Sequence, residues 1–219
     1  MKTKENGRSM VEMLGVLAIM AVLSVGALAG FNKAMDKYKL NKHAEQISYM
    51  MAVALENNDT LKNASFDMIS ELKALGAFSW DINAQEGHLG LVNNQFVELR
   101  DSLQNKMWFE NYHQINNGGY AVGIELVLSD KAVQICHNFI NVFKQFATEL
   151  DGVYVTKKKE NQSSRNAFAG RVCSSEKCLA TITNDDIINM CRAHCADADK
   201  CNLYAVWDYP ASTVKALFN

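Results

Sequence analysis

The chain has 219 residues, of which 48% are hydrophobic and 21% are charged, and its formal net charge is −2. The apolar fraction excludes an intrinsically disordered chain, and one proline beside twelve glycines excludes a collagen-like or linker-dominated architecture. A pI near 6.2 does not indicate a nucleic-acid-binding surface, which requires a basic excess.

The first predicted element is an apolar helix over residues 13–31, which reads MLGVLAIMAVLSVGALAGF and contains no charge. At about 1.5 Å per residue this helix would be roughly 28 Å long, close to the hydrocarbon thickness of a bilayer. The run therefore predicts a transmembrane segment. Two alternatives are a buried core helix, which normally has one polar face, and a cleavable secretory signal ending near Ala27-Leu28-Ala29.

A single acid, Glu12, lies at the edge of this apolar run. A charged side chain costs on the order of 2.5–3.5 kcal/mol at the centre of a membrane helix. An acid in this place without a nearby cation suggests that its partner comes from another molecule.

The residues that precede the apolar run carry a resemblance to a known family. Residues 7–12 read GRSMVE and follow a short leader that contains Lys2 and Lys4. This arrangement resembles the class III signal of type IV pilins and pseudopilins. The resemblance implies that a prepilin peptidase cleaves between Gly7 and Arg8, that Arg8 becomes N-methylated, and that Glu12 sets subunit register. Arg8 stands where the family commonly has a bulky apolar residue.

The same resemblance implies a function and a location. The chain would be a structural subunit, held in the bacterial inner membrane and then polymerised through its N-terminal helix into a periplasmic or cell-surface filament, a pilus. Implied partners are the prepilin peptidase, identical or related pilin subunits, and an inner-membrane assembly platform. Two alternatives are a pseudopilin of a type II secretion system and a membrane-anchored periplasmic binding module.

The helix is expected to continue past the membrane, because no glycine or proline interrupts residues 31–55. Apolar residues recur there at spacings of three or four and predict a stripe that packs on a globular head: Leu40, Ala44, Ile47, Met51 and Leu55. We therefore expect a leader over 1–7, one long helix over 8–57 and a head over 58–219. The alternative is two helices hinged at Gly30.

The head is expected to be α+β, with the long helix packed on an antiparallel sheet and a disulfide-braced C-terminal region. The order of strand, cysteine-bearing helix and strand loosely resembles the head of type IVb pilins. Periodicity and turn residues predict the following elements in chain order: a short helix over 60–75 that stops at Gly76, a strand over 95–100, a turn at 116–119, a strand over 120–128, a helix over 131–150, a strand over 153–156 and a polar loop over 157–166.

The cysteines predict disulfides, because their number is even and an extracytoplasmic head would lie in an oxidising compartment. They are Cys136, Cys173, Cys178, Cys191, Cys195 and Cys201. Six cysteines allow 15 connectivities. We expect Cys136 to pair with a C-terminal cysteine, and Cys191 and Cys195, four apart on a helix over 185–196, to take different partners. The alternative is a zinc site that also uses His194, although the spacing lacks the C-x2-C pair usual in structural zinc.

No catalytic residue is predicted. Cys136 and His137 are adjacent on a helix and therefore point in different directions, so we interpret them as a buried cysteine and a solvent-facing histidine. No combination of residues supplies a base, a nucleophile and an orienting group in a recognisable order. The expectation is a protein without enzymatic activity, cofactor, metal or nucleic-acid partner.

Overall fold

The computed structural model describes residues 10–64, 68–79, 99–113, 118–126, 131–160, 162–173 and 178–218. Contacts divide the chain into two units, Met1–Asn41 and Lys42–Asn219. Helix α1, Met10–Glu56, runs through the boundary between them without interruption. The prediction of one long helix is therefore confirmed, and the alternative of a hinge at Gly30 is wrong.

The second unit is α+β, and the six strands among its described residues form one antiparallel sheet in the order β1-β2-β3-β6-β4-β5. Its strands are β1 Leu99–Arg100, β2 Lys106–Asn111, β3 Tyr120–Glu125, β4 Gly152–Lys159, β5 Gln162–Ala169 and β6 Lys200–Trp207. The remaining helices are α2 Asn58–Leu61, α3 Ile69–Ala74, α5 Ala132–Lys144, α6 Asn184–Cys195 and α7 Ala211–Phe218.

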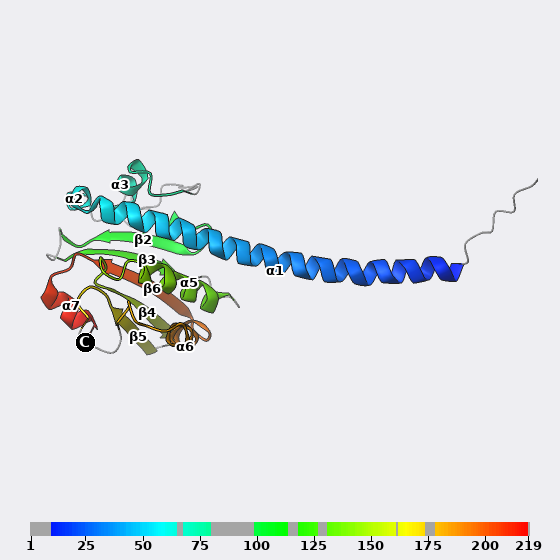
Figure 1. The fold of residues 1–219 in the computed structure, drawn as a ribbon. Coiled ribbons are helices and arrows are strands. Elements are labelled where there is room, and N and C mark those ends of the chain that lie inside the picture. The colour runs from blue at the N-terminus through cyan, green and yellow to red at the C-terminus, as the bar shows by residue number, and fades with distance from the viewer. Residues whose placement is uncertain are drawn as a thin grey trace, which may run out of the picture. The chain divides into compact units, whose positions relative to one another are not determined.

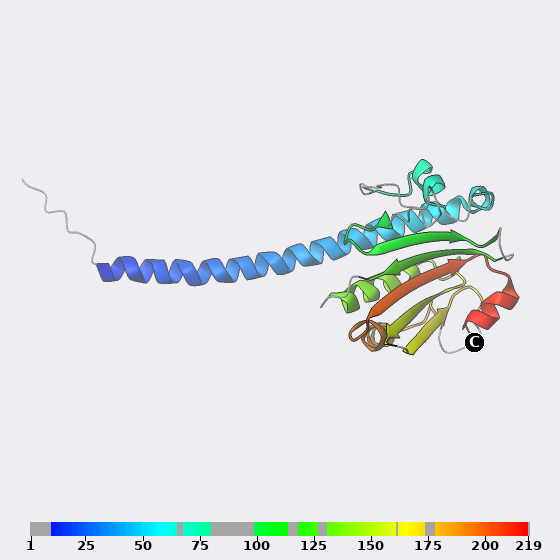
Figure 2. The same ribbon diagram turned by 180° about the vertical axis from the view of Figure 1, so that it is seen from behind.

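The two faces of the sheet differ in burial because side chains alternate along each strand. Two cross-strand rows are almost fully buried and define the inner face: Met107, Ile124, Leu203 and Val155, then Phe109, Val122, Ala205 and Val153. Helix α5 lies on one side of the strands, in front of them in Figure 1 and behind them in Figure 2. The residues between these rows define the outer face, which is only half-buried around Trp108, Tyr204 and Tyr154.

The segment of α1 within the second unit buries a different stripe from the predicted one. Ile47 and Met51 are buried as expected, and Met50 and Ala54 join them. Ala44 and Leu55, by contrast, are only partly buried, as is Leu40, which belongs to the first unit. The buried face is rotated by about one residue because it also includes His43, a polar residue that hydrophobic periodicity assigns to solvent.

His43 is buried because Asp101 receives its hydrogen bond. The Nε2 atom of His43 lies 2.7 Å from Oδ2 of Asp101. The other carboxylate oxygen accepts from the backbone N–H groups of Leu103 and Asn105, each at 2.8 Å. The Asn105 side-chain amide donates to Oδ2, also at 2.8 Å. This carboxylate therefore links α1 to the turn between β1 and β2.

Replacing Asp101 by asparagine is expected to lower the free energy of unfolding by about 1–3 kcal/mol. The substitution exchanges one carboxylate oxygen, which accepts two hydrogen bonds, for an NH2 group, which can only donate. Chemical denaturation of the detergent-solubilised chain, followed by near-UV circular dichroism, measures this loss. Asp185→Asn is the control, since Asp185 is exposed on α6 and its substitution should stay within about 0.5 kcal/mol. Equal stability of the two variants would contradict the assigned role.

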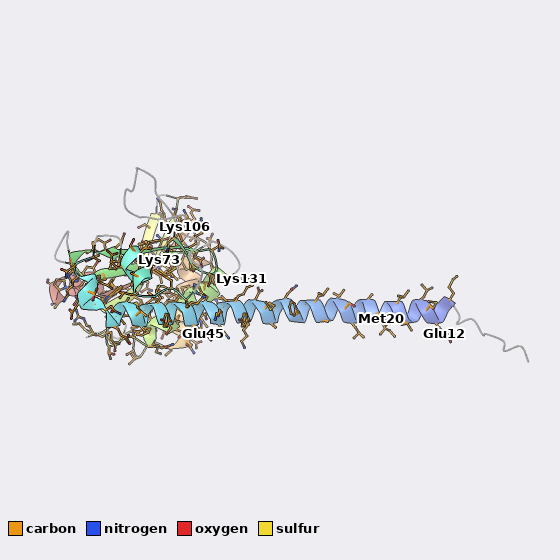
Figure 3. All side chains as sticks on the ribbon, turned by 90° about the horizontal axis from the view of Figure 1, so that it is seen from above. Glu12, Met20, Glu45, Lys73, Lys106 and Lys131 are labelled. Atoms are coloured by element: carbon orange, nitrogen blue, oxygen red, sulfur yellow. A yellow bond between two sulfur atoms is a disulfide. The ribbon has the colours of Figure 1, made fainter. Side chains whose placement is uncertain are left out.

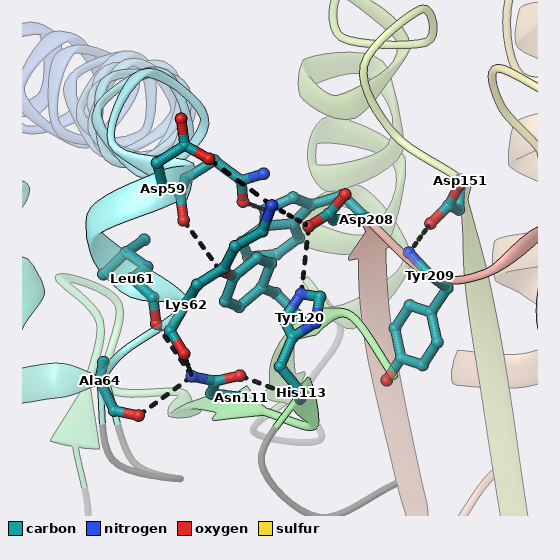
Figure 4. A network of polar contacts seen from close by, with 12 residues as sticks. Asp59, Leu61, Lys62, Ala64, Asn111, His113, Tyr120, Asp151, Asp208 and Tyr209 are labelled. Atoms are coloured by element: carbon teal, nitrogen blue, oxygen red, sulfur yellow. Dashed lines mark hydrogen bonds and ion pairs between the residues drawn. The ribbon is translucent and has the colours of Figure 1, made fainter. Parts of the chain in front are cut away.

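A polar junction attaches the connection after α1 to the sheet (Figure 4). The side-chain amide of Asn111 donates to the carbonyl oxygens of Leu61 and Ala64 at 2.9 and 3.1 Å. The hydroxyl of Tyr120 donates to the carbonyl of Asn58 at 2.8 Å, and the Trp207 indole donates to the Asn58 side chain at 3.2 Å. These bonds tie α2 and the residues that follow it to strands β2, β3 and β6.

The prediction of a polar loop over 157–166 is wrong, because residues 157–159 belong to β4 and residues 162–166 belong to β5, and the two strands pair as a hairpin. β4 is paired on both sides, with β5 and with β6, so backbone pairing overrides its polar composition. Its lysines also find partners: the Lys157 amine donates to the carbonyl of Ala193 at 3.2 Å, and Lys159 forms an ion pair with Asp197 at 2.5 Å.

Other predicted elements are present with different bounds. The predicted helix over 60–75 corresponds to the two short helices α2 and α3, and the chain leaves α3 at Gly76 with a positive φ of 72°. The strand over 120–128 ends at Glu125, and the helix over 131–150 ends at Lys144, followed by turns. Of the strand over 95–100 and the turn at 116–119, residues 95–98 and 116–117 lie outside the described residues. Strand β2 was not predicted.

The six cysteines form three disulfides: Cys136–Cys191, Cys173–Cys178 and Cys195–Cys201. Cys136 pairs with a C-terminal cysteine, and Cys191 and Cys195 take different partners, so both expectations are confirmed. The first bridge joins α5 to α6, and the third joins the end of α6 to β6. The zinc alternative needs thiolates, whereas every cysteine sulfur of the chain is bonded to another in a disulfide.

Candidate functional site

The candidate site is the first turn of α1 together with the apolar surface that follows it. Glu12 lies in that first turn and is exposed. Within the described ranges, no hydrogen bond or ion pair reaches its carboxylate. An acid at a helix N-terminus is favoured by the helix dipole, which is the simplest structural reason for Glu12. Gly7 and Arg8, the residues predicted to flank the cleavage site, lie outside the described residues.

The apolar half of α1 is exposed on every side. Among residues 13–31 the large hydrophobic side chains are between 52% exposed, at Val16, and 74% exposed, at Val22. Figure 3 shows side chains pointing outward around the helix from Glu12 past Met20 toward Glu45. An 18-residue window of α1 has a mean hydropathy of 2.3 and none of it is buried, so the helix is long and apolar enough to cross a membrane. A core helix of this chain would be buried instead.

The polar groups within this apolar segment are satisfied internally, as a bilayer requires. Ser24 is the only residue with a side-chain hydroxyl between positions 13 and 31, and it donates to the carbonyl of Met20 at 2.7 Å. Apart from the adjacent residues and the backbone of the helix itself, no heavy atom lies within 4 Å of the place where a Cβ would stand on Gly15, Gly26 or Gly30. Their surfaces are therefore open to a neighbouring helix, and small residues are what close helix packing in membranes uses.

Sequence reasoning missed a second group of residues, on the outer face of the sheet. Trp108 and Tyr204 meet edge to face, with ring centroids 5.6 Å apart, and Tyr204 stacks on Tyr154 at 4.5 Å. Glu110 lies beside them and accepts a hydrogen bond of 2.6 Å from the Tyr112 hydroxyl. The signal for this group was the alternation of Trp108 and Glu110 with the apolar residues Met107 and Phe109, which is visible only once residues 106–111 are assigned to a strand.

Glu110 is expected to make the stability of the second unit depend on pH. Burial raises the pKa of this carboxyl above its ordinary value, and the Tyr112 hydrogen bond opposes that rise only in part. The folded state therefore holds the proton more tightly than the unfolded state, and it loses stability as the pH rises through the raised pKa.

Glu110→Gln is consequently expected to raise the melting temperature at pH 7.5, because an amide avoids the desolvation of a carboxylate. The gain should vanish at pH 3.5, where the carboxyl of the wild-type Glu110 is protonated in both the folded and the unfolded state. Thermal unfolding at the two pH values measures the difference, and a gain of equal size at both would contradict this assignment.

Comparison with known proteins adds no relative: no family model matches the chain, and no curated protein or solved structure is significantly similar to it.

Proposed function

We propose that this protein is a structural subunit of a type IV pilus-like filament, processed by a prepilin peptidase and polymerised through α1. The observation that carries the proposal is a lone exposed acid in the first turn of a helix that is apolar on all sides. The spacing of this acid from Gly7, in GRSMVE, is the spacing of the class III signal.

The proposed assembly follows from charge pairing in an apolar medium. Cleavage after Gly7 exposes a backbone amine with a reference pKa of about 7.7–8, which is largely protonated near neutral pH. If the helix extends to the new N-terminus, the amine would lie about one turn from Glu12 of its own chain. In a bundle, the amine of an arriving subunit would instead reach the Glu12 of its neighbour. An unpaired charge in hydrocarbon is unfavourable, so the pair favours docking at one axial offset.

The exposed apolar surface supplies the remaining contact area. Before assembly it would face lipid, and in the filament it would face the equivalent helices of other subunits. Gly26 and Gly30 offer positions at which two backbones can approach closely. The disulfide-braced second unit would then form the outer surface, where three covalent bridges resist unfolding outside the cell.

Mass spectrometry of the native polypeptide tests this proposal directly. The expected mature chain begins at Arg8 and carries one additional methyl group on its backbone nitrogen. A Gly7→Ala chain serves as the matched control and should keep its leader. An intact Met1 on the native chain would instead support a membrane-anchored periplasmic module, which needs the apolar helix but not the cleavage.

A pseudopilin of a secretion system would pass the same test, because it shares the processing signal. Electron microscopy of material sheared from cells separates the two. Long surface fibres that contain this chain support a pilus subunit, and fibres confined to the periplasm support a pseudopilin.

A further inference from the structure

The outer face of the sheet carries a row of aromatic residues in cross-strand register. Trp108 of β2 lies opposite Gly123 of β3, Gly123 lies opposite Tyr204 of β6, and Tyr204 lies opposite Tyr154 of β4. All three aromatic residues are half-buried, whereas the neighbouring rows on the inner face of the sheet are almost fully buried. The sheet thus presents π surface on the side that is only partly covered.

Gly123 allows Trp108 to lie down on the sheet. A Cβ placed on Gly123 would fall onto three ring atoms of Trp108, namely Cε2, Nε1 and Cζ2. Since those atoms lie at similar distances from that point, one face of the indole rests on the glycine. The Tyr204 ring stands beside it at an interplanar angle of 68°. The opposite face of the indole therefore points away from the sheet, and the Tyr204 ring borders it on one side. We call the angle between these two rings the corner.

This corner belongs to a hollow of about 520 Å³, lined by the aromatic residues and by a polar rim. That volume falls within the range usual for small-ligand sites. On the rim, Glu110 is held by the Tyr112 hydroxyl at 2.6 Å, and the Arg165 guanidinium lies 4.1 Å from the centroid of the Tyr154 ring. Thr156 completes the rim with a hydroxyl that can both donate and accept.

The charges of the rim select against ionic ligands. Glu110 repels phosphates and other anions, and Arg165 already places a cation on Tyr154, so a second cation gains little there. The Glu110 carboxylate and the Arg165 guanidinium give the rim one negative and one positive charge. A neutral ligand with hydroxyl groups is therefore the best electrostatic match. Within the described part of the chain, no hydrogen bond involves the Trp108 indole N–H or the hydroxyls of Tyr154 and Thr156, so these groups can bond a ligand.

We propose that this hollow binds a neutral saccharide, with the free face of Trp108 stacked on the sugar ring. The C–H bonds on one side of a pyranose are weakly positive and apolar, and the indole face is negative. Glu110, Thr156 and Arg165 then bond the sugar hydroxyls, the first as an acceptor and the last as a donor. This inference does not depend on the proposed filament function.

The test uses the full chain in a polyoxyethylene detergent, whose headgroup contains no sugar. Neutral oligosaccharides of glucose, galactose and N-acetylglucosamine are titrated, with binding measured by saturation-transfer NMR and calorimetry. A single-stranded oligonucleotide and an anionic polysaccharide are titrated in parallel. We expect saturable binding of at least one neutral oligosaccharide and none of the anionic probes.

Trp108→Ala should weaken that binding by about tenfold or more, the effect of removing a stacking surface. The matched control is Tyr49→Ala, which removes an aromatic ring that is 51% exposed on α1 and should leave affinity unchanged. If Trp108→Ala loses its near-UV circular dichroism, Arg165→Ala takes its place, because Arg165 is exposed and its loss should weaken binding about fivefold. Failure of every neutral oligosaccharide to bind, equal binding by the variants, or preferred binding of an anionic probe would overturn the proposal.

Discussion

Glu12→Ala is expected to abolish filaments while leaving the protein in the membrane. Insertion depends on the apolar run, and removing a charge near it can only make insertion more favourable. Assembly depends on neutralising the amine of the arriving subunit, and without Glu12 that amine would be buried unpaired. If the lost pairing is worth about 2–3 kcal/mol per subunit, the concentration required for assembly rises roughly 30- to 150-fold.

Membrane fractionation and electron microscopy of sheared fibres measure the two halves of this prediction separately. Glu45→Ala is the matched control, because Glu45 is also an exposed acid of α1 but lies outside the apolar run (Figure 3). It should leave both insertion and filaments unchanged. Glu12→Gln should behave like Glu12→Ala, since it keeps the size of the side chain and removes only its charge.

The competing explanation of Glu12 predicts a different result. If the acid only stabilises the first turn through the helix dipole, its loss costs about 0.3–1 kcal/mol and affects a single helix end. Filaments would then form normally at slightly higher subunit concentration. Normal filaments from both Glu12 variants would therefore leave Glu12 with a local structural role and would remove the main support for the proposed function.

The long helix was predictable because two strong local signals coincide. Residues 13–31 contain no charge, and no glycine or proline interrupts residues 31–55, so both length and continuity could be derived from the sequence. Its buried face was predicted less well. His43 enters that face only because Asp101, 58 residues later, supplies an acceptor, and periodicity cannot represent a partner so distant in sequence.

The sheet shows the same division between local and long-range information. β3 and the start of β4 are rich in β-forming residues and were predicted, whereas β5 is polar and exists because β4 pairs with it over its whole length. The aromatic hollow was missed for a related reason. Trp108, Tyr204 and Tyr154 come from three separate strands, and only the register of the sheet brings them into one row.

The cysteines were recognised as disulfide partners from their number, but their pairing depends on the packing of α5 against α6. That packing brings Cys136 and Cys191 together with their Cα atoms 5.8 Å apart, across 55 residues of sequence. The local bridge between Cys173 and Cys178 spans only 5 residues. The two bridges therefore differ greatly in the freedom that each removes from the unfolded chain.

Removing the Cys136–Cys191 bridge is expected to destabilise the second unit about twice as much as removing the Cys173–Cys178 bridge. On chain-entropy estimates the losses are about 4 and about 2 kcal/mol, for alanine at both positions of each pair. For a unit of this size, these losses lower the melting temperature by about 8–16 °C and about 4–8 °C.

Burial increases the difference. Cys136 and Cys191 are fully buried, so replacing both by alanine also leaves a cavity between α5 and α6, whereas Cys173 and Cys178 are only partly buried. Scanning calorimetry of the two double variants measures which loses more stability. The variant without the Cys173–Cys178 bridge is the control, because it loses one disulfide but little loop entropy. Equal shifts would mean that the unfolded chain keeps α5 and α6 together without the bridge, and packing rather than the covalent link would then hold the two helices in place.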